Sequence, residues 1–404
     1  MSIVRSGIRN LGLRSQIALA ASVIVSLAIG SCSTVPAATI TRPSGGGFEY
    51  TSSTTGTKPA DNGRSSDRAY STSTAIASAK STATRDKFKW PFSSKSPWNM
   101  PIGSGARYKP ANIQQAYFAG ADEELFYKVK ASDPVRSIYA PGAWGPGRCT
   151  GTSYPQGTMQ IPDNLIVPDA TKTSTPNNPS AFLMPDGKTL VQLNPLARCT
   201  AGGNVYGWRT RDVSIYGDGL PGGHGGSGLS SIGGSIRLGE LTGSQPIRHA
   251  LKINLWAQKY LYYSSSKPGY RWPAERADNY AASGYGGTNP SLVMGTLLAI
   301  PPSVTESSLG LQTPGGRKLF HALQNYGGYV VDDTAWDAHA LSVEKGVLEQ
   351  FRATFGYDFQ GSSGAFYSDF IKLFKAVHIV DNNGANSIGG GGKPRAPLAP
   401  PIGK

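Results

Sequence analysis

Residues 221–241 read PGGHGGSGLSSIGGSIRLGEL, and residues 247–256 read IRHALKINLW. After the glycines, apolar and other side chains alternate in both stretches, as they do in strands with one buried face. The short, turn-like segment TGSQP joins the two stretches. This pattern predicts an antiparallel hairpin that begins in a glycine-rich loop.

The register of this hairpin brings two ionisable side chains together. Aligning the apolar faces sets Leu238 opposite Leu251, and Glu240 then faces His249. A carboxylate beside an imidazole on an apolar face must be hydrogen-bonded, and such pairs recur at active sites. The alternatives are a purely structural polar pair or a slipped register. His224, in the loop, is expected to reach the same end of the sheet.

Known glycine-rich motifs do not account for the loop. The chain has no G-x-x-x-x-G-K-[ST] and no G-x-G-x-x-G that opens a helix. HGGSG is similar to a lipase oxyanion loop, but the G-x-S-x-G elbow is missing. H-E-x-x-H is also missing, so no helix-borne zinc site is expected. The plain alternative is a glycine-rich turn into a strand.

A second group of acids follows the apolar run GGYVV. Asp332 and Asp333 end that run, and Trp336 and Asp337 follow closely. Acids at strand ends often make only Asx-turns, but a double carboxylate beside a tryptophan is also a candidate catalytic site, so Asp332, Asp333 and Asp337 are candidate catalytic residues. Aromatic and cationic side chains in IRHALKINLW and GYRWPAERAD suit stacking on sugar rings. The expected substrate-binding residues are Arg248, Lys252, Trp256, Arg271 and Trp272.

The folded part is predicted to be mainly β, a β-sandwich or jelly roll with a few helices in its C-terminal half. AFLMPDGKTLVQLNP is typical of a hairpin because Asp-Gly suits a tight turn. RKLFHALQNYG, EKGVLEQFRATFG and AFYSDFIKLFKAV have apolar residues at helical spacing.

The N-terminus indicates export. Residues 1–32 combine a basic start, a short apolar run and an IGSC tetrad, which predicts a lipoprotein signal peptide with lipidation at Cys32. Residues 33–88 are rich in Ser, Thr and Ala and predict a disordered tether. Residues 89–397 form one expected domain, and 398–404 an irregular tail. The expected location is the cell envelope, at the outer membrane in a Gram-negative host.

Two further cysteines, Cys149 and Cys199, remain in a chain expected to be exported. An even remainder of this kind predicts a disulfide. No spacing of Cys or His suggests a metal centre, so no metal or other cofactor is expected, although a structural calcium ion is left open.

The charge of the chain says little about its partner. Residues 1–90 hold 11 basic and 4 acidic residues, and so carry half of the formal net charge of +14. The remaining, mildly basic part permits an acidic glycan without requiring one. No basic helix or aromatic motif indicates nucleic-acid binding. The expected partner is a polysaccharide or cell-wall glycan, the only expected membrane contact is the lipid anchor, and the expected state is a monomer.

Several strings resemble a family of secreted bacterial proteins with jelly-roll, carbohydrate-active-like folds and no firmly assigned reaction. The resemblance spans Ser96 to Pro397 and rests on SPWNMPIG, GGHGGSGLSSIGGSIRLGEL, IRHALK, YGGTNPSLVMGTLLAIPP and YGGYVVDDTAWD. It implies a secreted, glycan-directed protein and assigns no catalytic residue.

Three functions follow from these observations. In a glycoside hydrolase, Glu240 would be the acid and Asp333 or Asp337 the second carboxylate. In a lyase acting on a uronate glycan, His249 or His224 would remove a proton while Arg248 or Lys252 neutralises the uronate. A non-catalytic surface lipoprotein that binds glycan is the third possibility. The paired acids favour hydrolysis.

Overall fold

The computed structural model describes residues 84–150 and 154–403. Within them, thirteen strands form one hydrogen-bonded sheet in the order β1-β13-β10-β11-β9-β12-β2-β5-β6-β7-β3-β4, with β8 paired to β6. The strands are β1 (Tyr108–Pro110), β2 (Phe118–Lys128), β3 (Val135–Tyr139), β4 (Pro155–Gln160), β5 (Ser180–Leu183), β6 (Thr189–Ala197), β7 (Val205–Arg209), β8 (Val213–Ser214), β9 (Leu251–Leu255), β10 (Leu297–Ala299), β11 (Gly328–Asp333), β12 (Ala338–Glu344) and β13 (His378–Val380).

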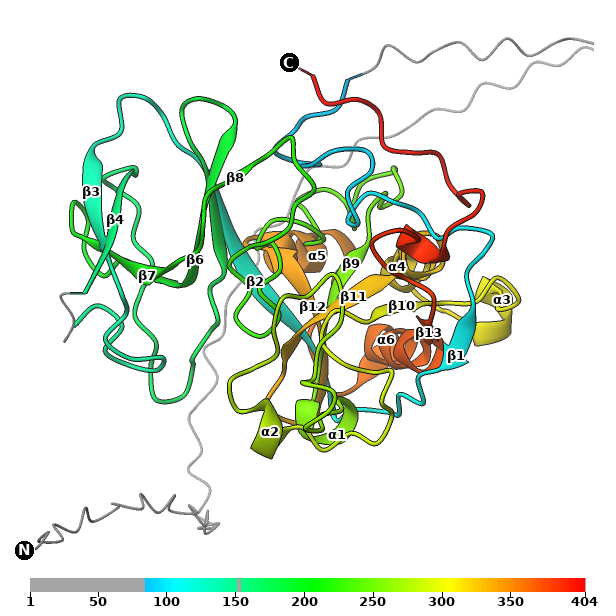
Figure 1. The fold of residues 1–404 in the computed structure, drawn as a ribbon. Coiled ribbons are helices and arrows are strands. Elements are labelled where there is room, and N and C mark those ends of the chain that lie inside the picture. Colours follow the sequence, from blue (N-terminus) through cyan, green and yellow to red (C-terminus); the bar gives the residue numbers. More distant parts are fainter. Residues whose placement is uncertain (1–83, 151–153, 404) are drawn as a thin grey trace, which may run out of the picture. The chain divides into compact units, whose positions relative to one another are not determined.

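The prediction of a mainly β fold is confirmed, but a sandwich or jelly roll is not. Parallel pairs (β11–β9, β12–β2 and β2–β5) lie beside antiparallel pairs in the same sheet. The predicted hairpin around Asp-Gly is present as β5 and β6, where Asp186 accepts the backbone N–H groups of Lys188 and Thr189. Figure 1 shows β3, β4, β6 and β7 gathered at one end, away from the larger helices.

The helices lie mainly in the second half of the chain, as expected. Within the described residues they are α1 (Ala257–Tyr260), α2 (Ala281–Gly284), α3 (Glu306–Leu309), α4 (Pro314–Asn325), α5 (Val347–Phe355), α6 (Gly364–Ala376) and the 3₁₀ turn η1 (Ile388–Gly390). The three predicted helical segments become α4, α5 and α6. Their apolar faces join the main core with the buried side of the central strands. Among residues 84–150 and 154–403, no helix is long and apolar enough to cross a membrane.

The central strands carry polar side chains on one face, and this face positions the candidate site. Asp122 and Glu124 alternate along β2, and Lys252 and Asn254 alternate along β9. Lys252 Nζ lies 2.5 Å from Glu124 Oε1, and Asn254 Nδ2 lies 3.5 Å from Asp122 Oδ2. The two strands therefore turn these four residues to the same side of the sheet.

The glycine-rich loop folds down onto this polar face. Lys252 Nζ donates to the carbonyl oxygens of Ser230 and Ser231, at 3.2 and 2.6 Å. A Cβ atom at Gly222 would come within 2.2 Å of Ser230 Cα, and one at Gly226 within 2.7 Å of Asp332 Oδ1. Glycine is required at these positions because the loop backbone packs directly against its neighbours.

The predicted hairpin between the two opening stretches is wrong. The residues after Ser235 form turns, with one isolated parallel bridge from Ile236 to Val343, and β9 pairs with β11 and β12 instead. Gly234 and Gly239 have φ of 79° and 88°, which lets the chain turn where a strand was expected. Leu238, expected on the buried face, is 41 % exposed.

The expected domain boundaries need correction at both ends. Phe88 belongs to the core, and Arg85 donates to the carbonyl oxygens of Trp90 and Pro400, so the folded part begins before residue 89. Ala399, placed in the predicted tail, is buried. Cys32 and most of the predicted tether lie outside the described residues.

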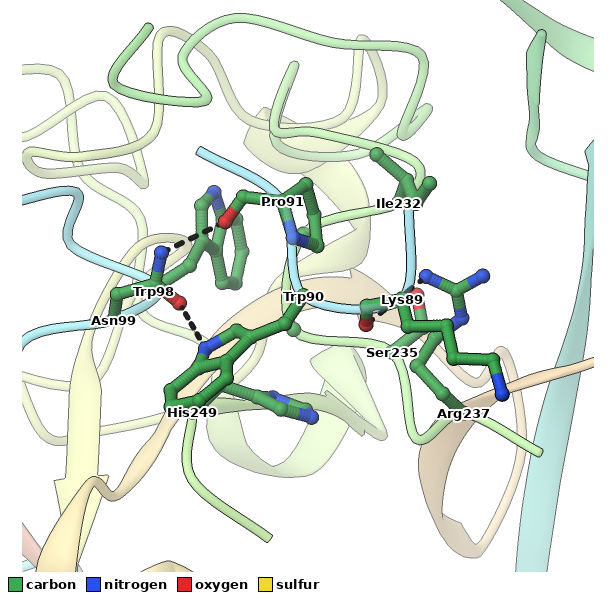
Figure 2. Close-up of a pocket in the computed structure, with 11 residues that line it drawn as sticks. Lys89, Trp90, Pro91, Trp98, Asn99, Ile232, Ser235, Arg237 and His249 are labelled. Carbon is green, nitrogen blue, oxygen red and sulfur yellow. Dashed lines mark hydrogen bonds between the residues drawn. The ribbon is translucent and has the colours of Figure 1, made fainter. Parts of the chain in front are cut away.

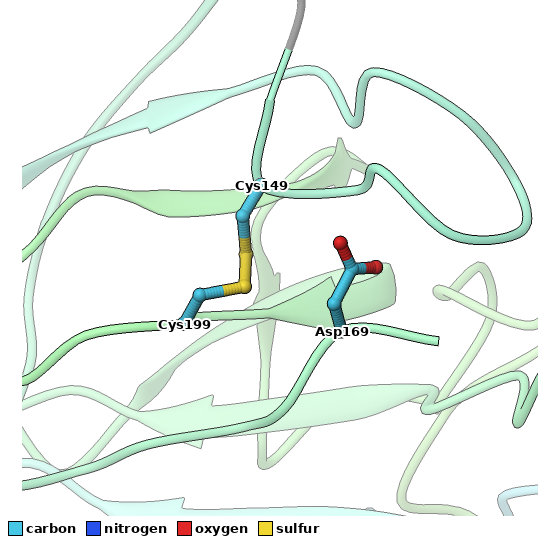
Figure 3. Close-up of side chains that lie close together, drawn as sticks. All are labelled: Cys149, Asp169 and Cys199. Carbon is cyan, nitrogen blue, oxygen red and sulfur yellow. A yellow bond between two sulfur atoms is a disulfide. The ribbon is translucent and has the colours of Figure 1, made fainter. Parts of the chain in front are cut away.

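The disulfide between Cys149 and Cys199 is present, as Figure 3 shows. Asp169 lies beside it and accepts the backbone N–H groups of Gly147 and Arg148, at 2.9 and 3.0 Å. The bridge and this carboxylate together fix the loop that carries Trp144.

Candidate functional site

Two adjoining hollows form a groove at the end of β11. Their volumes are about 590 and 360 Å³. We call them together the acidic groove, since they share four lining residues and together carry four carboxylates. The shared residues are Trp144, Asn177, Asp333 and Ala335.

Four aspartates line the acidic groove, and they come from three parts of the chain. Asp122 lies on β2, Asp332 and Asp333 end β11, and Asp278 lies in the loop between α1 and α2. Asn177 Nδ2 lies 3.3 Å from Asp122 Oδ2 and 3.4 Å from Asp332 Oδ2. A single amide thus holds together acids that are more than 200 residues apart in sequence.

His224 links these acids to the buried polar face of the sheet. Its Nδ1 lies 3.1 Å from Asp332 Oδ2, and its Nε2 lies 2.9 Å from Glu124 Oε1. Burial and Lys252 lower the pKa of His224, but the hydrogen bonds to Asp332 and Glu124 outweigh them and raise the pKa to about 9. In the absence of other ligands His224 is therefore a cation at neutral pH.

Two carboxyl groups in the groove hold their protons unusually tightly. Burial, reinforced by Asp332 and Asp333, raises the pKa of Asp278 to about 7. Burial also raises the pKa of Asp122 to about 7, with Glu124 adding to the effect and His224 opposing it. An acid with a pKa near neutrality can donate a proton in a reaction at neutral pH.

Tyrosines hold two of the acids in place. Tyr285 Oη donates to Asp278 Oδ2 at 2.7 Å, and Tyr280 Oη donates to Asp333 Oδ2 at 3.0 Å. Asp333 Oδ1 also accepts the backbone N–H groups of Ala257 and Ala335, each at 2.8 Å. These three donors fix the orientation of Asp333.

Exposed aromatic side chains flank the groove. Trp144, Trp336 and Tyr280 are 49, 48 and 44 % exposed, and all three line it. Trp336 packs against Phe118, with ring centroids 5.2 Å apart. Large aromatic faces left open beside paired carboxylates are suited to stacking on sugar rings.

Glu240 and His249 are in contact, but they lie away from the groove. Glu240 Oε2 is 3.0 Å from His249 Nε2 and also accepts the backbone N–H of Arg237 at 2.7 Å. Figure 2 shows the side chain of His249 beside that of Trp90. His249 precedes β9, whereas Asp333 pairs with Leu255 at the opposite end of that strand. The structure thus separates the predicted Glu240 acid from its predicted partners.

The contacts of His224 also differ from those expected. It contacts Asp332 and Glu124, and not Glu240 or His249. Asp337 does not line the groove; its Oδ1 is buried without a hydrogen-bond partner. Of the predicted catalytic residues, the structure brings together His224, Asp332 and Asp333.

The predicted substrate-binding residues lie elsewhere. Arg248 bonds to Gln245, and Arg271 donates to two backbone carbonyl oxygens, of Asp381 and Asn383. Lys252 is fully buried against Glu124, and Trp256 packs against the core. None of the five lines the groove, and Trp272 is only partly exposed.

Sequence reasoning missed several residues of the site. Asp122 and Glu124 lie in ADEEL, which has the appearance of an exposed charged strand. Asn177 and Trp144 lie in long loops whose paths cannot be deduced from local pattern. The alternation of Asp122 and Glu124 within a strand gives no sign that a distant loop covers the polar face of that strand.

No protein-family model matches the chain, and neither curated proteins nor solved structures give a significant match. The residues and geometry of the acidic groove are therefore the basis for the proposed function.

Proposed function

We propose that the protein is a glycoside hydrolase that acts on a polysaccharide or cell-wall glycan in the acidic groove. One observation carries the proposal: Asp278 and the hydrogen-bonded Asp333 line one cavity flanked by exposed tryptophans. The retention of a proton on Asp278 supports the assignment.

In this proposal Asp278 is the general acid. It protonates the oxygen that leaves when the glycosidic bond breaks, and burial keeps it protonated near neutral pH. Asp333 is the second carboxylate, which stabilises the positive charge that develops on the sugar and either attacks it or activates water. Its three hydrogen-bond donors hold it in place.

The aromatic side chains support a glycan over other hydrolysable substrates. Trp144 lines both hollows, and Trp336 and Tyr280 each line one, so successive sugar rings could stack along the groove. The resemblance of the sequence to secreted carbohydrate-active-like proteins agrees with this proposal. We also propose that the protein is exported and anchored to the membrane by a lipid at Cys32.

A lyase acting on a uronate glycan receives less support. Four carboxylates line the groove, and among its lining residues Arg276 is the single Lys or Arg. Without a bound cation, these carboxylates would repel an anionic substrate. Lys252, which was expected to neutralise a uronate, is bound to Glu124 beneath the surface. The non-catalytic alternative gives no reason for a buried acid beside other acids in a groove.

The test is to incubate the purified protein with a panel of neutral, amino-sugar and uronate glycans. Release of reducing ends without an unsaturated product supports hydrolysis. An ultraviolet-absorbing unsaturated product would instead establish a lyase, and binding without cleavage a glycan-binding protein.

A further inference from the structure

We propose that Asp122, His224 and Asp332 bind a divalent transition-metal ion, Zn²⁺ or Mn²⁺, at the floor of the acidic groove. This inference goes beyond the proposed function, since the assigned acid and carboxylate, Asp278 and Asp333, are not among the ligands. It can be tested on the resting protein without any glycan.

The geometry of the three side chains suits one ion. A carboxylate oxygen from each aspartate and a ring nitrogen of His224 all lie within 4.8 Å of one another. Metal–ligand bonds of about 2.0–2.2 Å require such atoms to lie no more than about 4.4 Å apart, so small side-chain movements would complete the site. The ligands come from β2, from the glycine-rich loop and from the end of β11, so an ion would join three separate segments.

Glu124 prepares His224 to act as a ligand. Its carboxylate accepts hydrogen bonds from Lys252 and Ser235, and its Oε1 faces His224 Nε2 as an acceptor. Nε2 therefore carries a hydrogen, and Nδ1, which points toward Asp332, is the nitrogen available to a metal. A carboxylate behind a histidine commonly fixes the tautomer of metal-binding imidazoles.

Buried polar atoms beside Asp122 provide independent support. Asn254 is 3 % exposed and lines the groove, and its Oδ1 has no hydrogen-bond partner. Ser342, the register partner of Asp122 on β12, is fully buried and its Oγ also has none. Unpartnered buried oxygens of this kind indicate a bound ion or its water. Asn254 Oδ1 is the candidate for a fourth ligand.

The donor set and the local charge define the class of ion. One imidazole with two carboxylates and an amide oxygen suits Zn²⁺ or Mn²⁺, whereas Ca²⁺ requires six to eight oxygen ligands. The carboxyl groups of Asp122, Glu124 and Asp332 surround the site, with Lys252 as a nearby cation, so the local charge suits a divalent ion. Among the described residues, the other cluster of potential ligands is Cys149, Cys199 and Asp169, and its sulfur atoms form a disulfide.

The experiment measures metal content and affinity on the full chain. The protein is stripped with a chelator, dialysed against ZnCl₂, MnCl₂, CaCl₂ or MgCl₂, and analysed for bound metal and for thermal unfolding. We expect one Zn²⁺ or Mn²⁺ per chain and a rise in melting temperature. Less than about a tenth of an equivalent of either ion, or binding of Ca²⁺ alone, would overturn the proposal.

Variants locate the ion. D122N and H224Q should weaken Zn²⁺ or Mn²⁺ binding at least tenfold, while E240Q, which lies away from the groove, should not. Circular dichroism in chelator shows whether each variant is folded.

If H224Q does not fold, the absorption spectrum of the Co²⁺-loaded wild-type protein reports nitrogen ligation directly. Unchanged affinity in D122N, or a Co²⁺ spectrum with oxygen ligation alone, would refute the site. Glycan hydrolysis without metal binding would refute the metal site and leave the hydrolase proposal intact. Metal binding without glycan hydrolysis would support the metal site and count against the hydrolase proposal.

Discussion

His224 Nε2 lies 2.9 Å from Glu124 Oε1, and both side chains are fully inaccessible to solvent. Lys252 Nζ contacts the same carboxylate oxygen from β9. The glycine-rich loop is thus fastened to the sheet by a buried ionic network, and its histidine is held beside the acids of the groove. A loop that looks mobile in sequence is in this way part of the rigid core.

Glu124→Gln should strongly destabilise the protein, because it leaves Lys252 buried without its counter-charge. Removal of one partner of a buried ion pair costs about 3–5 kcal/mol. The free energy of unfolding in urea measures the effect. The double variant E124Q/K252M, which removes both charges, should recover part of the loss. A cost below about 1 kcal/mol for E124Q would contradict the network.

Glu240→Gln should affect stability and leave activity unchanged, since the Glu240–His249 pair lies outside the groove. Burial lowers the pKa of His249, but Glu240 raises it above its ordinary value of 6.5. The pair's contribution is therefore complete below pH 6.5 and is lost as pH rises through the folded pKa. The variant should lose about 1–2 kcal/mol at pH 6 and less at pH 9. Equal losses at both pH values, measured by urea unfolding, would argue against an ionic pair.

The sequence allowed correct prediction where local pattern dominates. Helices α4, α5 and α6 have clear apolar periodicity, and the Asp-Gly turn of β5 and β6 has a specific chemistry. The pairing of Cys149 with Cys199 could be predicted because they are the two cysteines that remain besides Cys32. Asp332 and Asp333 were identified because they end an apolar strand.

Long-range pairing could not be deduced in the same way. The hairpin prediction failed because Gly234 and Gly239, both with positive φ, turn the chain on either side of Ser235. Strand β9 pairs instead with β11 and β12, about 80 residues away in sequence. Asp278 lies in a segment interpreted as a sugar-binding cluster. Its proximity to Asp332 depends on how two distant loops meet, and no local pattern records that contact.

Asp278→Asn should stabilise the protein at alkaline pH. The folded pKa of about 7 lies above the ordinary value of 3.8, so the wild-type protein loses stability as pH rises between these values. The amide does not titrate and avoids this loss. The melting temperature of D278N minus that of the wild type should increase from pH 4 to pH 7 and then level off. A difference that does not change with pH would show that Asp278 titrates normally.

Removal of the disulfide should weaken the loop region around Trp144. Cys149 and Cys199 are 50 residues apart, and the chain-entropy estimate for such a loop is about 4 kcal/mol. The double variant C149S/C199S should therefore unfold at lower urea concentration than the wild type. Thiol counting on the denatured, unreduced protein should find neither of these cysteines free, and detection of both as free thiols would contradict the bridge.

The most direct test of the proposed chemistry compares glycan hydrolysis by the wild type, D278N and D358N. Asp358 is an exposed aspartate paired with Arg352, which makes D358N a matched control for loss of a carboxylate. On whichever glycan the wild type cleaves, D278N should lower kcat at least about a hundredfold, as loss of a general acid does, and D358N should not. Cleavage by D278N at more than about a tenth of the wild-type rate, or no cleavage of any glycan by the wild type, would contradict the assignment of Asp278 as the catalytic acid.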